Sequence, residues 1–179
     1  ARARLFQLLP AREPRRWLYD LVADYPRRGG RGFRPSLCIA TARAFGCPLA
    51  DVLDTATSIE LFHNAMLVHD DIEDDSERRR GEPTMHKTYG VPIAVNVGDM
   101  LGLLGMRPLF ANFGRLGPRV ALRVLEETER MATESAEGQA MELGWRHENA
   151  LDVSEADYLE MVLKKTCWLG MIHPLRMGV

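Results

Sequence analysis

The sequence has few cysteines and no long apolar run. Its three cysteines, Cys38, Cys47 and Cys167, are odd in number and widely spaced, and none forms a C-x-x-C pair. This spacing excludes the usual zinc motifs, so we expect buried, reduced thiols in a cytoplasmic protein. No stretch of about 18 apolar residues occurs, and we expect no transmembrane segment. The apolar stretch near the N-terminus is too short for a signal peptide.

An excess of charge of either sign is also missing. The sum of Lys and Arg is 23 and that of Asp and Glu is 25, which gives a net charge of −2. Without a basic field, nucleic acid is disfavoured as the main partner. Hydrophobic residues make up 46% of the 179 residues, which is typical of globular proteins and excludes disorder. We therefore expect a single domain over residues 1–179 with a substantial core.

Strand patterns are absent as well. Apolar residues instead recur at three- and four-residue intervals, and Pro and Gly separate the periodic segments. Ser154 followed by Asp157 is typical of a helix start. The pattern predicts an all-α fold, a bundle of long helices. The periodic segments are 13–24, 33–45, 49–75, 91–112, 117–145 and 154–177.

The sequence does have an unusual acidic stretch, LVHDDIEDDSERRRGEPTMH, at positions 67–86. Five acids fall within six residues, and three arginines follow almost at once. Four-residue steps from Met66, on the apolar face of the predicted helix, lead to Asp70 and Asp74, with Asp71 beside them. Carboxylates so close together repel one another, and they oppose the dipole at a helix C-terminus. A positive charge is therefore expected nearby.

Two interpretations of this cluster are open. In the first, it is a solvated helix end that the following arginines neutralise. In the second, Asp70, Asp71 and Asp74 bind Mg²⁺, which uses one or two carboxylates per ion and completes its shell with water and substrate phosphate. Zinc does not fit, because His63 and His69 are six residues apart and do not form a ligand pair.

Three basic patches favour a phosphate ligand. Arg79 and Arg80 precede a glycine, and guanidinium groups bind phosphate oxygens bidentately. The loop RRGGRGFRP at 27–35 has glycines that allow close approach of an anion just before a helix start. A lysine pair and a threonine follow at 164–166. Alone, the loop at 27–35 and the lysine pair are each more simply explained as an exposed basic surface. Together with the apolar stripe, the three patches suit a diphosphate head and a hydrocarbon tail.

This combination resembles the trans-prenyltransferases, also called polyprenyl or isoprenyl diphosphate synthases. HDDIEDDSERRRGEPTMH is similar to their first aspartate-rich motif with its trailing Arg-Arg-Gly, and GGRGFRP to their G-G-K-x-x-R-P loop. GVPIAVNVGD, EGQAMEL and YLEMVLKKT follow in the family's order. The resemblance implies an isoprenoid synthase fold, Mg²⁺ as cofactor and a homodimer. It also implies that isopentenyl diphosphate is condensed with an allylic diphosphate.

The resemblance further implies roles for individual residues. Without the family pattern, His63 would be explained equally well as a core histidine. The implied residues are Asp70, Asp71 and Asp74 for Mg²⁺; Arg79, Lys165 and Thr166 for the allylic diphosphate; Arg31, Arg34, His63 and Arg80 for isopentenyl diphosphate; and Gln139 beside the reacting carbons.

The chain departs from the family pattern in three places. Arg31 stands where Lys is usual, so a planar fork replaces a point charge and the affinity for isopentenyl diphosphate is expected to differ. Gly32 replaces a common Arg, with little expected effect on the chemistry. No second aspartate-rich motif follows residue 166. We therefore expect a truncated rather than a degenerate chain, lacking a third Mg²⁺ and one wall of the pocket.

Residues one and two turns before Asp70 are expected to line a tunnel for the hydrocarbon tail. One turn is about 5.4 Å, which puts Ala65 and Met66 near the first added isoprene unit and Phe62 about a turn deeper. Phe62 or Leu61 would form the floor. Because Ala65 is small and Met66 is adaptable, we predict a geranylgeranyl-sized product, with farnesyl as the alternative.

Three other functions fit parts of this pattern. A class I terpene cyclase uses the same acidic motif, but it does not need the second basic pocket that GGRGFRP and Arg80 supply. A non-catalytic subunit of a prenyltransferase is disfavoured by the intact Asp and Arg motifs. A metal-binding surface without catalysis does not explain the apolar stripe and three ordered basic patches.

Overall fold

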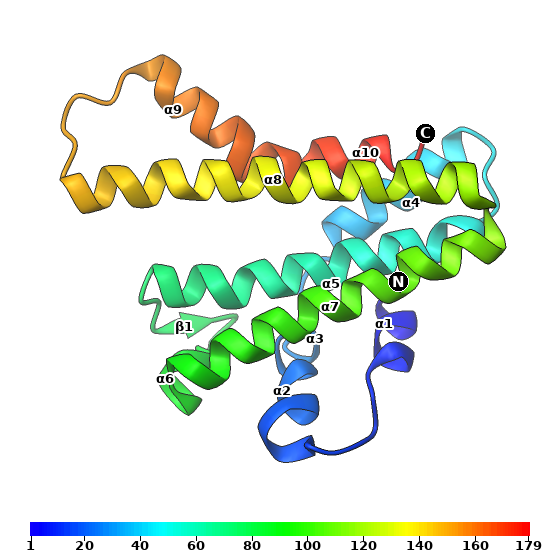
Figure 1. The fold of residues 1–179 in the computed structure, drawn as a ribbon, viewed down its shortest axis with the longest axis horizontal. Helices are drawn as coiled ribbons and strands as arrows, with labels where there is room; N and C mark the ends of the chain where they lie inside the picture. Colours follow the sequence, from blue (N-terminus) through cyan, green and yellow to red (C-terminus); the bar gives the residue numbers. More distant parts are fainter.

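The computed structural model describes residues 1–179 and confirms the predicted all-α class (Figure 1). A two-stranded hairpin is its only β structure. The elements are α1 (Arg2–Leu8), η1 (Arg15–Tyr19), α2 (Asp20–Val22), α3 (Asp24–Arg27), α4 (Phe33–Ala44), α5 (Leu49–Glu73), β1 (Arg78–Arg79), β2 (Glu82–Pro83), α6 (Met85–Tyr89), α7 (Val91–Arg115), α8 (Pro118–Glu148), α9 (Glu155–Val162), η2 (Leu163–Ile172) and α10 (His173–Arg176).

Local chemistry sets the ends of the long helices. α7 and α8 each follow a glycine with positive φ, Gly90 and Gly117, and each has a proline in its first turn. Proline suits that position because its missing N–H needs no partner there. α9 begins with the predicted cap: Ser154 and Asp157 bond each other's backbone N–H reciprocally.

The long helices run antiparallel to their neighbours along the chain (Figure 1). α5 and α7 lie side by side, and α8 runs beside the continuous path of α9, η2 and α10. The N-terminal elements α1 to α3 cover the side of α5 and α7 that faces away from α8 (Figure 1). α5 therefore lies at the centre of the fold, with neighbours on several sides.

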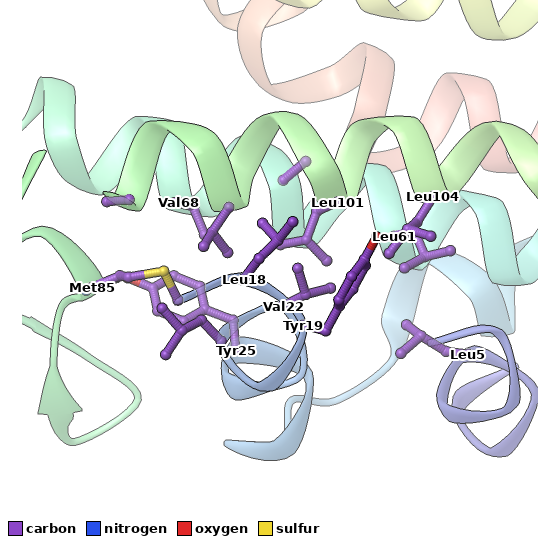
Figure 2. Packing of buried hydrophobic residues seen from close by; sticks show 14 residues of the cluster. Leu5, Leu18, Tyr19, Val22, Tyr25, Leu61, Val68, Met85, Leu101 and Leu104 are labelled. Atoms are coloured by element: carbon purple, nitrogen blue, oxygen red, sulfur yellow. The ribbon is translucent and has the colours of Figure 1, made fainter. Parts of the chain in front are cut away.

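The main core joins the N-terminal elements to α5 and α7, as Figure 2 shows. Tyr19 points from below toward Leu61 of α5, and Tyr25 lies beside Met85 (Figure 2). A second cluster packs Val52, Ala56 and Ile59 of α5 against α4, and a third joins α8 to η2 around Met131, Trp168 and Leu169. The single apolar stripe predicted for α5 is thus divided: its first half faces α4, and Phe62 and Met66 face α8 and η2.

Buried polar bonds fix α5 against α7. Ser58 donates from Oγ to the Gly105 carbonyl over 2.7 Å, and Asn112 donates to the Thr55 hydroxyl over 2.9 Å. Each such bond contributes about 1 kcal/mol net, and leaving a buried partner unpaired costs about 1–3 kcal/mol. These bonds set the register of the two helices that enclose the site.

α7 is long and apolar enough, by length and composition alone, to cross a membrane. It is the one helix that departs from the expectation, made from the sequence, that no segment could span a membrane. Nearly half of its most apolar stretch is buried inside the protein, and core helices of soluble proteins meet the same criterion. α7 packs against α5 and α8, and its buried residues belong to the core.

Candidate active site

The C-terminal end of α5 carries the acidic cluster. The side chains of Asp70 and Asp74 lie one turn apart and are 28% and 30% exposed. Adjacent residues on a helix point about 100° apart. Asp71 consequently faces the interior, and its side chain is fully buried.

Asp71 is bound by two protein groups. The Tyr25 hydroxyl donates to Oδ2 over 2.6 Å, and Arg79 donates from Nε to Oδ1 over 2.9 Å. Burial, followed by the bond to Asp71, raises the pKa of Tyr25, which therefore remains a protonated donor. Asp71 does not line the site described below. Its position suits holding Arg79 in place, and this differs from the metal-ligand role predicted from the sequence.

Asp70 and Asp74 face cationic side chains. Asp70 lies 3.2 Å from Arg79 Nη2 and 3.6 Å from Lys165 Nζ, and Asp74 lies 2.8 Å from Arg146 Nη2. Burial raises the pKa of Asp70, and the charge of Asp74 raises it further against the opposing effects of Lys165 and Arg79. The two carboxylates thus retain a repulsion that a bound cation would relieve.

This donor set fits Mg²⁺, although no three His, Cys, Asp or Glu side chains converge on one point. Mg²⁺ needs only one or two protein carboxylates, because water and phosphate oxygens complete its shell. Asp70 and Asp74 offer two carboxylates on one face of α5. That Asp70, Asp71 and Asp74 all bind Mg²⁺ stays a prediction.

A cavity of about 790 Å³ opens beside Asp70, between α5, α7, α8 and η2. Along α5 its lining changes within two turns from Asp70 to apolar side chains, which Met106 and Leu169 extend on facing helices. Nine residues singled out in the sequence line this one cavity: Arg34, Phe62, His63, Ala65, Met66, Asp70, Gln139, Lys165 and Thr166.

Five other predicted site residues do not line the cavity, and neither does Leu61, the alternative floor, which is buried in the main core. Arg31 is exposed in the loop before α4. Arg79 and Arg80 lie in and beside the hairpin strand β1, and Asp71 and Asp74 lie at the end of α5. Arg79 nevertheless reaches the cavity mouth through its ion pair with Asp70.

A second polar centre forms where Arg34 meets His63. Arg34 Nη1 lies 3.2 Å from His63 Nε2. Burial, followed by the positive charges of Arg34 and Arg80, lowers the pKa of His63 to about 3. His63 is therefore neutral near pH 7, and Nε2 accepts from the guanidinium, which can only donate. Arg34 Nε is buried without a partner, as suits a site that takes an anion.

The glycine-rich loop and the hairpin come together at Arg80. A Cβ on Gly30 would lie 3.0 Å from Arg80 Nη2, and Arg80 donates from Nη1 to the Tyr25 carbonyl over 2.9 Å. Burial raises the pKa of nearby Glu60, and the charges of Arg80 and Arg34 oppose that shift. Glycine at position 30 thus makes room for an arginine side chain, and two basic patches that are distant in sequence become one.

The third basic patch lies on η2, where the helix is π-wound. π-Helical segments are frequent at functional sites. Lys165 and Thr166 line the cavity, and Lys165 Nζ lies 2.6 Å from Glu142, whereas Lys164 pairs with two other glutamates of α8. A Cβ on Gly138 would lie only 2.2 Å from the backbone nitrogen of Lys165, so glycine there permits the close approach of α8 and η2.

The sequence matches the Polyprenyl synthetase family over residues 15–179. The chain belongs to this family. It is 39% identical over 141 residues to the "Short chain isoprenyl diphosphate synthase" of Methanothermobacter thermautotrophicus, which covers 79% of this chain and 42% of that protein. It is 36% identical to the "Geranylgeranyl pyrophosphate synthase" of Geoglobus acetivorans, over 89% of this chain and 49% of that protein.

Solved structures agree with this assignment and confirm the isoprenoid synthase fold. The geranylgeranyl pyrophosphate synthetase from Pyrococcus horikoshii Ot3 superposes with a TM-score of 0.90 at 35% identity, covering 99% of this chain and 52% of that one. The chain therefore spans about half the length of the relatives that it matches.

Some residues at the site of this family member were not found from the sequence. Tyr25 positions Asp71 from 46 residues away and gives no local signal. Arg146 lies four residues after Glu142 on α8, and the pair faces the acidic cluster. The one sequence signal for Arg146 is its position three residues after the motif EGQAMEL, which ends at residue 143. His69 also lines the cavity, with its Nε2 3.4 Å from an Asp99 oxygen.

Proposed function

We propose that the full-length protein is a Mg²⁺-dependent trans-isoprenyl diphosphate synthase, which condenses isopentenyl diphosphate with an allylic diphosphate. The observation that carries the proposal is one cavity that leads from Asp70 and Lys165 at its charged mouth to Phe62 at its apolar end. Relatives named as geranylgeranyl and short chain isoprenyl diphosphate synthases support it. The charged mouth suits a diphosphate, and the apolar interior suits a prenyl tail.

The allylic diphosphate would bind at the mouth, where Arg79, Lys165 and Thr166 are available. Its C1–O bond breaks, and the bonding electron pair leaves with the diphosphate. Asp70 and Asp74 would hold Mg²⁺, which would supply charge neutralisation for the leaving group. Cationic side chains aimed at that developing charge lower the barrier most in a site that excludes water.

Isopentenyl diphosphate would bind at the second basic centre, formed by Arg34, Arg80 and neutral His63, with Arg31 from the loop. Its double bond then attacks the allylic cation, a C–C bond forms, and the departing diphosphate takes the lost proton. Gln139 would lie beside the reacting carbons; its amide donates to Glu73 over 2.6 Å and so bridges α8 and α5.

The apolar lining would both protect the cation from water and limit the product. Ala65 and Met66 leave room beyond the first turn, whereas Phe62 lies about 12 Å along the helix from Asp70, two turns away. This arrangement supports a geranylgeranyl-sized product. Phe62→Ala should lengthen the product, and an unchanged distribution would contradict the assignment of Phe62 as the floor.

The proposal includes a homodimer in the cytoplasm with no nucleic-acid partner. Exposed apolar side chains on α7 and α8, among them Phe110, Val120 and Leu122, support association with a second copy. Light scattering of the full-length protein would give its mass in solution, and a monomer at micromolar concentration would contradict the homodimer.

The test is product analysis by mass spectrometry. The full-length protein receives Mg²⁺, isopentenyl diphosphate and dimethylallyl, geranyl or farnesyl diphosphate in turn. Asp70→Asn should reduce turnover by on the order of 10²–10³-fold, the loss typical for one group that stabilises developing charge. Asp75→Asn is a matched control, because Asp75 belongs to the same acidic run but is 78% exposed and pairs with Lys87.

Each outcome distinguishes the candidate functions. Longer prenyl diphosphates would support the synthase. Hydrocarbon release without consumption of isopentenyl diphosphate would identify a terpene cyclase. Failure to turn over any substrate would instead favour a non-catalytic subunit.

A further inference from the structure

The deep end of the cavity is formed where Phe62 of α5 meets Gly105 of α7. Gly105 is buried, and the Phe62 ring lies against it. A Cβ at position 105 would lie 3.1 Å from each of two ring carbons, Cδ2 and Cε2. Since this is closer than ordinary van der Waals contact, the ring occupies the space that any side chain at 105 would need.

The two helices cannot readily separate at this point. Ser58, one turn before Phe62, donates to the carbonyl of Gly105 itself over 2.7 Å, and both groups are buried. Moving α7 away would break this bond and leave the carbonyl unpaired. A methyl group at 105 should therefore displace the ring rather than the helix.

The displaced ring has one direction to go. α7 lies on one side of Phe62, and the cavity and the cluster of Met131 and Leu169 lie on the other. Because buried Met131 and Leu169 already pack against Phe62 on that side, the ring would move toward the open volume of the cavity. The deep end would become shallower.

We propose that Gly105 determines product length: by lacking a side chain it lets the Phe62 ring lie back against α7, and so keeps the deep end open for the hydrocarbon tail. The inference rests on the proposed synthase function. It assigns to α7 a part of the length control that the sequence assigned to α5 alone.

The experiment measures the products of full-length Gly105→Ala. The ratio of the longest product to the next shorter one should fall by about 10-fold, the discrimination that one methylene in an apolar pocket provides. Gly114→Ala is the matched control, since it adds the same methyl group to α7 with nothing within 4 Å. It should leave the distribution unchanged.

A second pair of variants tests whether the methyl group acts through the ring. Phe62→Leu removes the ring and makes room at 105, so Phe62→Leu and Phe62→Leu/Gly105→Ala should give the same product length even if Gly105→Ala alone fails to fold. A shorter product from the double variant would overturn the inference, as would a folded Gly105→Ala with an unchanged distribution. Neither result would contradict the proposed synthase function. Absence of any prenyl product from the unmodified protein would overturn both that function and the inference about Gly105.

Discussion

The triad of buried Tyr25, buried Asp71 and partly exposed Arg79 gives the sharpest prediction. The Tyr25 hydroxyl donates to Asp71 over 2.6 Å and accepts from the Met85 amide over 3.2 Å. Tyr25→Phe keeps the ring in the core and removes only the oxygen. It leaves a buried carboxylate short of one donor and a buried amide without an acceptor.

The magnitude follows from these two losses. A hydrogen bond to a charged group contributes about 1.5–3 kcal/mol, and an unsatisfied buried N–H costs about 1–3 kcal/mol. Because Asp71 retains Arg79, the lower ends of both ranges apply, and the free energy of unfolding should fall by about 2.5 kcal/mol. Under the proposed function, a looser Arg79, which pairs with Asp70, should also lower kcat/KM for the allylic diphosphate by about 10-fold, the lower end for groups that support metal ligands.

Chemical denaturation and steady-state kinetics of the full-length protein check both numbers. Tyr19→Phe is the control, because Tyr19 lies in the same core and its hydroxyl accepts only from Arg12, over 3.0 and 3.1 Å. Its expected loss is about 1 kcal/mol or less. Equal losses of unfolding free energy in the two variants would refute the reasoning that the bond to the Asp71 carboxylate makes the Tyr25 hydroxyl contribute more than that of Tyr19.

Three further predictions concern caps, helix contact and pH. Ser154→Ala removes the capping box of α9 and should lower the free energy of unfolding by about 1 kcal/mol, as denaturation would measure. Gly138→Ala should reduce turnover by displacing η2, whereas Gly144→Ala on the same helix, with nothing within 4 Å, should not; equal activities would contradict this. Burial lowers the pKa of His63 to about 3 and that of His173 to about 4, from an ordinary 6.5. Since the unfolded chain then binds protons that the folded one does not, stability should fall as pH drops below about 6.5, and constant stability between pH 7 and 5 would refute this.

The fold could be predicted from the sequence where its signals are local. Five of the six predicted helical segments correspond closely to α4, α5, α7, α8 and the run from α9 to α10. The first, 13–24, is instead broken into short pieces, and α1, α6 and the hairpin were not predicted. Such elements are too short for apolar periodicity to be read. The hairpin also turns through Arg80 with φ of 55°, a conformation that the residue type does not suggest.

The site could be predicted by type but not by orientation. Periodicity placed Asp70 on the cavity side correctly, because residues four apart share a face. Which of two adjacent aspartates turns inward depends on how α5 packs against the rest of the chain, where Tyr25, 46 residues away, meets Asp71, and no local rule reports it. The pairing of Asp74 with Arg146 likewise depends on how α8 crosses α5. The local sequence determines which residues share a helix face, whereas the packing of the helices determines which residues of other helices they contact.

The charged mouth is arranged for exchange of partners. Asp70 already has Arg79 and Lys165 beside it, and Asp74 has Arg146, so each carboxylate is partly neutralised without a ligand. Under the proposed function, Mg²⁺ would take over the carboxylates while the freed cations turn to the diphosphate. Each charge then loses one opposite partner and gains another, and little desolvated charge is left unpaired. Fully buried Asp71 holds Arg79 through Nε and also bonds the Nη2 that faces Asp70, so the arginine would keep a fixed geometry during this exchange. Under the proposed function the adjacent aspartates would therefore not be duplicates: Asp70 would present its charge to the ligand, and Asp71 would fix the arginine that competes for it.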